Sequence, residues 1–244
     1  MVEDVSIDVE IWSDIACPWC YIGKRRFEKA LEQFEHADEV KVTWRSYQLD
    51  PTLPEHDDRS EVDYLVASKG LPRAQVEEMV GHVAEQAEGE GLSYDFDALV
   101  VANSRRAHRV LQAAKAADAV DDGNRTDALK EALLAAHFEA GEDIGDVEIL
   151  TRLAAEVGLD QSEAREAVDS QELDAAVDRD IADAAAIGVR GVPFFVFQNK
   201  YGVSGAQPPE VFAQALETVW NERTPALITL DGGTGEACGP EGCD

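Results

Sequence analysis

Residues 17–20 are Cys17-Pro18-Trp19-Cys20, and they lie between two segments of different periodicity. Before them, apolar and polar residues alternate over positions 7–11, a period of two that is typical of a β-strand. After them, residues 27–34 place apolar side chains three and four positions apart, which is typical of an amphipathic helix. Pro18 suits the first turn of such a helix, where its missing N–H costs nothing. The stretch therefore predicts two cysteines at a strand-to-helix turn, one helical turn apart.

This placement predicts the chemistry of the two thiols. Unpaired backbone N–H groups and the positive end of the helix dipole stabilise a thiolate at a helix N-terminus. We expect the pKa of Cys17 to fall below the free value of about 8.5 for that reason. Cys20 is close enough to attack a mixed disulfide formed on Cys17. The motif predicts thiol–disulfide exchange; half of a zinc site and two unreactive thiols are the alternatives.

The composition restricts the partners of the protein. The chain has 244 residues, of which 45% are hydrophobic, and a formal net charge of -29 with only 21 Lys and Arg. Such a surface repels nucleic acid and anionic lipid, and it destabilises the compact state in dilute buffer. Molar salt shortens the Debye length to about 3 Å and removes that penalty. The charge therefore predicts a halophilic protein, with an acidic mesophilic protein as the alternative.

The sequence also bears on the compartment. The first six residues lack a basic segment followed by an apolar one, and no apolar run approaches the roughly 18 residues of a membrane span. We expect a cytoplasmic protein with no membrane partner. In that compartment a cysteine pair is more often catalytic than structural.

The rest of the chain predicts an order of elements. A second strand is predicted from residue 40 to near Leu49, and the proline-dotted, charged run 51–60 predicts a loop and a domain boundary. Residues 61–188 are predicted to be helical almost throughout, with one apolar stripe at 99–111, and are followed by a hairpin and a last helix. The expected divisions are 1–56, the first part of an α/β domain; 57–188, a helical insertion domain; 189–224, its second part; and 225–244, an acidic, Gly-rich tail with a cysteine pair.

Four segments together resemble the DsbA-like thioredoxin superfamily, and specifically its FrnE-like cytosolic branch. They are residues 13–23, residues 103–109, the triplet Gly191-Val192-Pro193 and residues 203–207. The resemblance implies an α/β fold, namely a thioredoxin fold with a large all-helical insertion between the second strand and the cis-proline loop. It also implies that Cys17 is the nucleophile and Cys20 the resolving thiol.

The resemblance further implies a cis Val192–Pro193 bond, a state found in only about 5–6% of such bonds in folded proteins. The Val192 backbone would then be free to pair with an extended peptide. From the residues alone, Pro193 also fits the first position of a strand.

One position departs from the family pattern. The periplasmic oxidases of the superfamily carry a histidine between their cysteines, where this chain has Trp19. A histidinium would stabilise the thiolate, and Trp19 cannot. We therefore expect a Cys17 pKa between the thioredoxin and DsbA values of about 7 and about 3.5, and a weaker oxidant than DsbA.

Further candidates surround the motif. Asp14 is a possible proton relay, although an Asp there also shapes turns. Trp12, Trp19 and Tyr21 could form an apolar rim that binds substrate, and Trp12 could instead belong to the core. Asn103 and His108 match a family segment that faces the cysteines, with helix-packing hydrogen bonds as the alternative.

The tail carries Cys238 and Cys243, separated by two glycines, a proline and a glutamate. They are a possible second redox pair, since some FrnE-like proteins have such a Cys-x4-Cys pair. The alternatives are a disordered tail and a four-thiolate metal site shared with Cys17 and Cys20. The other histidines show no metal spacing, and we expect no metal.

These observations predict a thiol–disulfide oxidoreductase that acts on protein or small-thiol disulfides and needs no cofactor beyond its redox-active disulfide. The direction of the reaction, as reductase, isomerase or oxidase, stays open. An isomerase or transferase of small aromatic or polyketide substrates, of the glutathione-dependent thioredoxin-fold type, is the alternative; such enzymes typically have serine in place of Cys17. A non-catalytic peptide-binding or metal-binding module is a third possibility.

Overall fold

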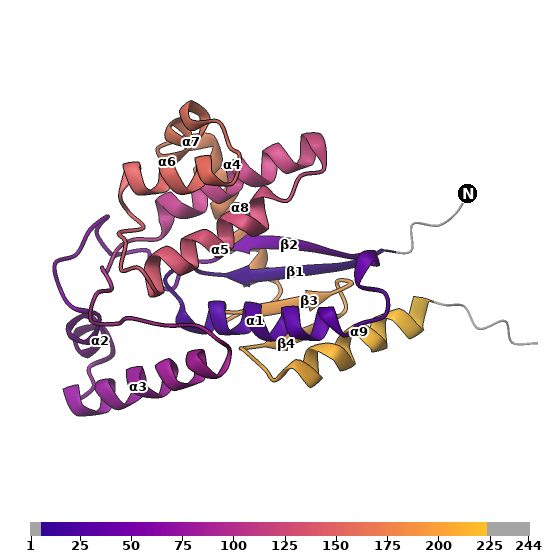
Figure 1. Cartoon of the computed structure of the whole chain (residues 1–244), viewed down its shortest axis with the longest axis horizontal. Helices are drawn as coiled ribbons and strands as arrows, with labels where there is room; N and C mark the ends of the chain where they lie inside the picture. Colours follow the sequence, from indigo (N-terminus) through magenta and orange to yellow (C-terminus); the bar gives the residue numbers. More distant parts are fainter. Residues whose placement is uncertain (1–5, 224–244) are drawn as a thin grey trace, which may run out of the picture.

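A mixed four-stranded sheet in the order β2-β1-β3-β4 organises the computed structural model, which describes residues 6–223 (Figure 1). The strands are β1 (Ile7–Ser13), β2 (Val40–Ser46), β3 (Phe194–Phe197) and β4 (Tyr201–Ser204). β1 runs parallel to β2 and antiparallel to β3, and β3 runs antiparallel to β4. A parallel pair needs a crossover connection, and α1 (Pro18–Glu32) followed by a short 3-10 turn (Ala37–Glu39) provides it.

One face of the sheet is covered by α1 and α9 (Pro209–Arg223), which contact each other. Ile7, Val9 and Ile11 are fully buried on this face, as their alternation predicts. They pack with aromatic side chains that include Phe27 of α1 and Phe212 of α9. Burial of each such side chain contributes about 1.5–3 kcal/mol, so this cluster fixes α1, and with it the cysteine motif, against the sheet.

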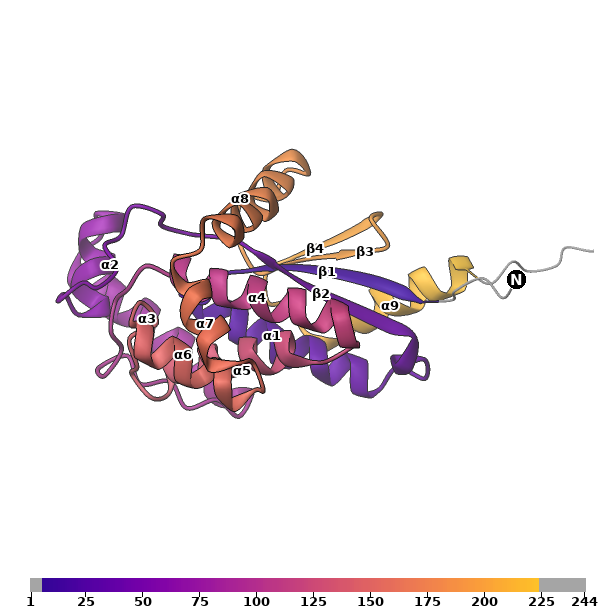
Figure 2. The same ribbon diagram turned by 90° about the horizontal axis from the view of Figure 1, so that it is seen from above.

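The opposite face is covered by α8 (Gln171–Ala186), and both views place α8 on the other side of the sheet from α1 (Figures 1 and 2). The contact includes a buried polar group, Asp180, which is 3% exposed. The Trp12 indole N–H donates to the Asp180 carbonyl at 2.8 Å. The Asp180 carboxylate accepts hydrogen bonds from Arg45, the Ser46 backbone and Gln112, the last on α4 (Arg105–Asp121).

The helical insert lies between β2 and β3 in the chain. Besides α4 and α8 it comprises α2 (Glu61–Lys69), α3 (Arg73–Gly89), α5 (Arg125–Phe138), α6 (Val147–Glu156) and α7 (Gln161–Val168). Helices α4 to α7 share one apolar core, with Leu111, Leu133 and Leu153 among its members. Helices α2 and α3 lie apart from it, beyond the carboxyl end of β1 (Figure 1).

The predicted order of strand, helix, strand, helical insert, hairpin and helix is confirmed, as is the α/β class. The stripe predicted at 99–111 was wrong in its first part, because α4 begins only at Arg105. Leu99 and Val101 are apolar because they are buried in an extended segment, where Val101 forms a bridge with Asp57. The predicted domain boundaries at 56/57 and 188/189 stay predictions. Within residues 6–223, the helices are too short or too polar to span a membrane.

Candidate functional site

The cysteine motif forms the junction of β1 and α1. Cys17 is the N-cap residue in an extended conformation, Pro18 occupies the first turn, and the Cys20 N–H donates to the Cys17 carbonyl at 2.9 Å. Both cysteines are free thiols and both are buried, with 4% of Cys17 and 1% of Cys20 exposed. Cys17 lines a pocket beside the motif, whereas Cys20 does not. Of the two cysteines, Cys17 is therefore the one that forms part of the pocket wall.

The loop before β3 covers the thiol of Cys17. The Val192–Pro193 peptide bond is cis, and the Cys17 thiol donates to the Val192 carbonyl at 3.5 Å. Gly23 of α1 lies directly under this loop, because a Cβ at that position would stand 2.8 Å from Pro193 Cγ. The absence of a side chain at Gly23 thus permits the close approach of α1 to Pro193.

The prediction of a lowered pKa for Cys17 was wrong for the reduced pair. The hydrogen bond with Cys20 and the burial of the sulfur raise the pKa of Cys17 well above its usual value. For Cys20, burial opposes ionisation, but the hydrogen bond from Cys17 and the positive charge of Lys130 lower its pKa overall. When the pair loses its first proton, the remaining proton is shared between the two sulfurs, and the negative charge is favoured on Cys20.

Lys130 of α5 is a residue that sequence reasoning missed. Its side chain is 1% exposed, and its ammonium makes no hydrogen bond with any residue of the described range. The ammonium lies 5.6 Å from the centre of the Trp44 ring. Burial lowers the pKa of Lys130 to about 8, against the attraction of the cysteines and Asp14. Lys130, Leu134 and His137 are spaced as one helical face, and that buried face was the signal that could have found Lys130.

Asp14 and His108 form a buried pair next to the motif. Asp14 Oδ1 lies 3.2 Å from His108 Nε2, and each residue is 1% exposed. Burial raises the pKa of Asp14, but the hydrogen bond from His108 and those from its neighbours lower it overall; burial lowers the pKa of His108. A carboxylate only accepts, so a neutral His108 donates from Nε2. Asp14 also accepts from the Leu49 N–H at 2.7 Å, which ties the loop after β2 to the motif. Its role as a proton relay stays a prediction.

The other predicted substrate contacts are divided between surface and interior. Trp19 is partly exposed and lines the pocket. Trp12 and Tyr21 are 3% and 1% exposed, so they belong to the interior and not to the predicted rim. His108 is buried as well, and Asn103 holds a loop, since its amide donates to the Leu53 carbonyl at 2.7 Å. Both residues make hydrogen bonds within the protein, and their role in substrate binding stays a prediction.

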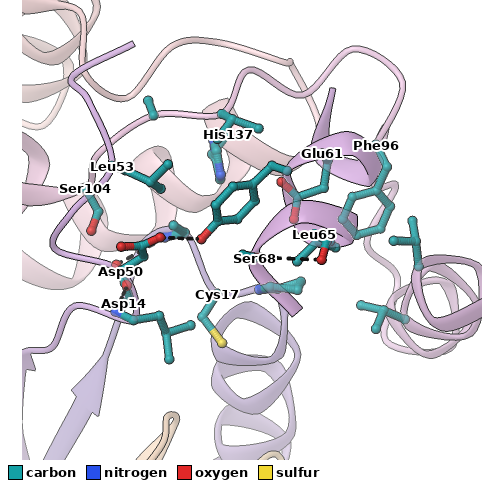
Figure 3. Close-up of a pocket in the computed structure, with 18 of the residues that line it drawn as sticks. Asp14, Cys17, Asp50, Leu53, Glu61, Leu65, Ser68, Phe96, Ser104 and His137 are labelled. Carbon is teal, nitrogen blue, oxygen red and sulfur yellow. Dashed lines mark hydrogen bonds between the residues drawn. The ribbon is translucent and has the colours of Figure 1, made fainter. Parts of the chain in front are cut away.

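The pocket has a volume of about 490 Å³, within the range of roughly 300–1,000 Å³ that is usual for small-molecule sites. Cys17, Asp14 and Ser104 lie on one side of it, and Glu61, Leu65 and Phe96 on the other (Figure 3). Its lining also includes the apolar side chains Leu49, Leu53, Met79, Val80, Val83 and Val101. The helices α2 and α3 thus complete a pocket that begins at the reactive thiol.

Cys238 and Cys243 lie outside the described residues, so their predicted role as a redox pair stays a prediction. Within residues 6–223, three or more His, Cys, Asp or Glu side chains do not come together in a group that could hold a metal ion.

A sheet of this order with a cysteine pair at the start of α1 and a proline loop against the thiol defines the thioredoxin class of folds. Residues 8–217 match the model of the DSBA-like thioredoxin domain. The chain belongs to this family, which confirms the resemblance to the DsbA-like superfamily. Its assignment to the FrnE-like branch stays a prediction.

The solved structures that are similar to this chain include the following three. A probable DsbA oxidoreductase from Streptomyces coelicolor is 42% identical, covers 98% of both chains and has a TM-score of 0.82. The cytosolic disulfide reductase DsbM from Pseudomonas aeruginosa, solved with glutathione (GSH), is 19% identical over 88% of this chain and 99% of its own, with a TM-score of 0.61. A 2-hydroxychromene-2-carboxylate isomerase is 14% identical over 88% and 97%, with a TM-score of 0.60. The last two similarities concern the fold alone.

Proposed function

We propose that this protein is a thiol–disulfide oxidoreductase that acts on small-molecule or peptide disulfides through Cys17 and Cys20. The observation that carries the proposal is the position of the two sulfurs. Cys17 lines the pocket, and Cys20 lies one helical turn behind it and is buried. This is the arrangement that a nucleophilic thiol and a resolving thiol require.

The reaction proceeds in two exchanges. The Cys17 thiolate attacks one sulfur of a disulfide R–S–S–R′, forms the mixed disulfide with R–S and releases R′–S⁻. The Cys20 thiolate then attacks the Cys17 sulfur, releases R–S⁻ and leaves the Cys17–Cys20 disulfide. Two electrons pass from the protein to the substrate, and the two thiol protons end on the two leaving thiolates. A dithiol such as dithiothreitol regenerates the reduced pair, and no other cofactor is needed.

The surrounding groups support each exchange. Once the pair has lost its first proton to solvent, transfer of the remaining proton from Cys17 to the Cys20 thiolate gives the attacking Cys17 thiolate, and the hydrogen bond between the two sulfurs provides the path. The Cys20 proton then passes to the leaving thiolate R′–S⁻. The positive charge of Lys130 then stabilises the Cys20 thiolate that performs the second attack. The Val192 carbonyl accepts a hydrogen bond from Cys17 in the reduced protein. An extended peptide substrate could pair with this backbone segment once Cys17 has reacted.

The proposal is tested by turnover of hydroxyethyl disulfide and insulin in molar salt, with dithiothreitol as reductant. Cys17→Ser is expected to lose all turnover above the uncatalysed rate. Cys20→Ser is expected to accumulate a mixed disulfide on Cys17 that intact-protein mass spectrometry detects. Turnover retained by Cys17→Ser would overturn the proposal. The reduction potential of the pair, measured in the same buffer, then gives the direction of the reaction in a compartment of known potential.

A second candidate is the isomerisation or glutathione-dependent transformation of a small aromatic substrate. The size and apolar lining of the pocket favour it, and the 2-hydroxychromene-2-carboxylate isomerase has a similar fold. Such chemistry does not use Cys17 as a nucleophile. It therefore requires that Cys17→Ser retain isomerase activity when glutathione is supplied, whereas the oxidoreductase loses its activity in the same variant.

A further inference from the structure

The pocket next to Cys17 contains one carboxylate that accepts no hydrogen bond from the described residues. Glu61, the first residue of α2, lines the pocket, and its carboxylate accepts no hydrogen bond from the residues in the range 6–223. The other two pocket carboxylates differ from it. Asp50 accepts from the Tyr64 hydroxyl at 3.0 Å, and Asp14 accepts from Leu49 and His108. Of the three, Glu61 alone keeps its acceptor capacity for a ligand.

Carboxylates outnumber basic side chains in the lining of the pocket. Its described lining contains three carboxylates, and Lys69 is the only lysine or arginine among the lining residues, with its side chain exposed. His137 does not alter this balance, because burial lowers its pKa to about 4 and leaves the ring neutral. A substrate that carries carboxylates would enter a site of its own charge. A cationic substrate would meet the opposite charge.

His137 supplies a second, independent indication that the pocket receives a polar ligand group. The imidazole is 3% exposed and lines the pocket, and its Nδ1 has no hydrogen-bond partner within residues 6–223. Figure 3 shows the ring extending from α5 on the side of the pocket across from Cys17. Buried polar atoms are normally hydrogen-bonded, so an unpartnered one beside a cavity calls for an explanation. A hydrogen-bonding ligand in the pocket is the explanation that these contacts favour.

We propose that the pocket selects disulfides that bear an amino group on a short apolar arm, and that Glu61 is the residue that binds this ammonium. The inference rests on the proposed function, since the disulfide end of the substrate must reach Cys17. The apolar lining, which includes Leu53, Leu65 and Val83, contacts the arm, and the Glu61 carboxylate accepts hydrogen bonds from the ammonium. Glu61 is in this view a specificity-determining residue, with no part in the exchange itself.

The experiment uses three disulfides of similar length and different charge: cystamine, hydroxyethyl disulfide and dithiodipropionate. Each oxidises the pre-reduced protein in a single turnover, with one protein dithiol oxidised and two small thiols formed, and tryptophan fluorescence follows the rate. The rate with free dithiothreitol corrects each disulfide for its intrinsic reactivity. The wild-type protein is expected to prefer cystamine over hydroxyethyl disulfide by about tenfold after this correction, because a charge-assisted hydrogen bond contributes that much.

The variants isolate Glu61. Glu61→Gln is expected to remove most of the tenfold preference of cystamine over hydroxyethyl disulfide, and Glu61→Lys is expected to favour dithiodipropionate. Glu78→Gln is the matched control, since Glu78 is exposed on α3, does not line the pocket and changes the net charge equally. It is expected to keep the preference.

Each outcome decides a different question. An unchanged cystamine preference in Glu61→Gln, with normal oxidation by hydroxyethyl disulfide, overturns the inference and leaves the proposed function standing. A preference lost equally in Glu78→Gln also overturns it, because net charge would then explain the effect. Failure of all three disulfides to oxidise Cys17 overturns the proposed function, and the inference falls with it.

Discussion

Two buried polar regions of this protein, one around Asp180 and one around the cysteine pair, differ in how well their groups are paired. Around Asp180 the carboxylate accepts from Arg45, Ser46 and Gln112 at 2.6–2.9 Å. Around the cysteine pair, three buried nitrogen atoms have no hydrogen-bond partner within the described range: His108 Nδ1, Lys130 Nζ and His137 Nδ1. The first region is paired by the protein's own groups, and the second is paired only in part.

The difference distinguishes structure from function. A buried polar group that is fully hydrogen-bonded stabilises one arrangement of the elements around it, here α8 and α4 against β2. A buried group that is left unpaired costs stability, about 1–3 kcal/mol for a neutral group. Such a cost is retained where the group acts in chemistry or binding. The comparison therefore predicts opposite consequences for substitutions in the two regions.

The largest effect is expected at Asp180. Asp180→Ala leaves the Arg45 guanidinium, the Ser46 N–H and the Gln112 amide without their buried acceptor. Removal of one partner from a buried charged network typically costs about 3–5 kcal/mol, and we expect a loss of about 3 kcal/mol or more in the free energy of unfolding. Denaturant unfolding in molar salt measures it.

Asp183→Ala is the control for that substitution, because Asp183 is exposed on the same helix. It is expected to change stability by no more than about 0.5 kcal/mol. A change of similar size in both variants would show that the buried hydrogen bonds of Asp180 do not stabilise the fold more than an exposed carboxylate does. It would contradict the structural role given to the Asp180 region.

The next effect is expected at Lys130, with the opposite sign. Burial lowers the pKa of Lys130 from its usual 10.5 to about 8. The unfolded chain therefore binds this proton more tightly, so stability falls as the pH drops from about 10.5 to about 8 and the penalty is complete at pH 7. A difference of that size corresponds to about 3 kcal/mol. Lys130→Met is expected to raise the free energy of unfolding at pH 7 by up to this amount.

The same variant is expected to impair the thiols that Lys130 faces. Loss of the positive charge raises the pKa of Cys20, and the apparent pKa of the pair is expected to rise by about one unit. The pH dependence of alkylation by iodoacetamide, measured on the reduced protein, reports this value. A variant that is stabilised and keeps its thiol pKa would assign Lys130 to packing alone.

The sequence predicted the features that depend on local pattern. The alternation of Ile7, Val9 and Ile11, the start of α1 at Pro18 and the hairpin of β3 and β4 follow from periodicity and turn chemistry. The position of Cys17 at the N-cap follows for the same reason. Family resemblance then supplied the order in which these pieces pair.

The environment of the thiols could not be predicted in that way, because it depends on residues far apart in the chain. The N-cap position of Cys17 predicted a lowered pKa, but burial and the hydrogen bond with Cys20 override it. Lys130, more than a hundred positions away, reaches the pair only after the insert has folded against α1. The environment of Tyr21 is a similar case, since its hydroxyl donates to Glu131, a contact that no local pattern indicates. The halophilic character inferred from the net charge stays a prediction.

A smaller effect is expected in the pH dependence of substrate preference. Burial raises the pKa of Glu61 to about 7, with Lys69 opposing the shift. Glu61 is thus half-ionised near neutral pH, and a bound ammonium requires the carboxylate. The corrected rate ratio of cystamine to hydroxyethyl disulfide is expected to rise several-fold between pH 6 and pH 8, with a midpoint near 7. The ratio removes the common effect of thiol ionisation.

Asp50, Tyr64, Lys69 and His137 also face this pocket, so the midpoint must be assigned. Glu61→Gln provides the assignment, because it is expected to give a ratio that does not change over the same pH range. A midpoint that persists in Glu61→Gln would assign the titration to another group. It would contradict the binding of the substrate ammonium by Glu61.

The smallest effect tests how closely α1 is packed against the proline loop. In Gly23→Ala the new Cβ would stand 2.8 Å from Pro193 Cγ, so the loop or the helix must shift. Overpacking costs about 1–3 kcal/mol, and the better helix propensity of Ala returns up to about 1 kcal/mol, which leaves a net loss of about 1 kcal/mol.

Gly81→Ala in α3 is the matched control, because nothing lies within 4 Å of its added Cβ. It is expected to gain about 0.5–1 kcal/mol from helix propensity alone. The two substitutions are thus chemically identical and opposite in sign. Gly23→Ala should also slow disulfide exchange, since a displaced Pro193 loop moves the Val192 carbonyl away from the Cys17 thiol. If both variants are stabilised and equally active, the contact between α1 and the loop is loose, and the rate of exchange does not depend on how closely Val192 approaches Cys17.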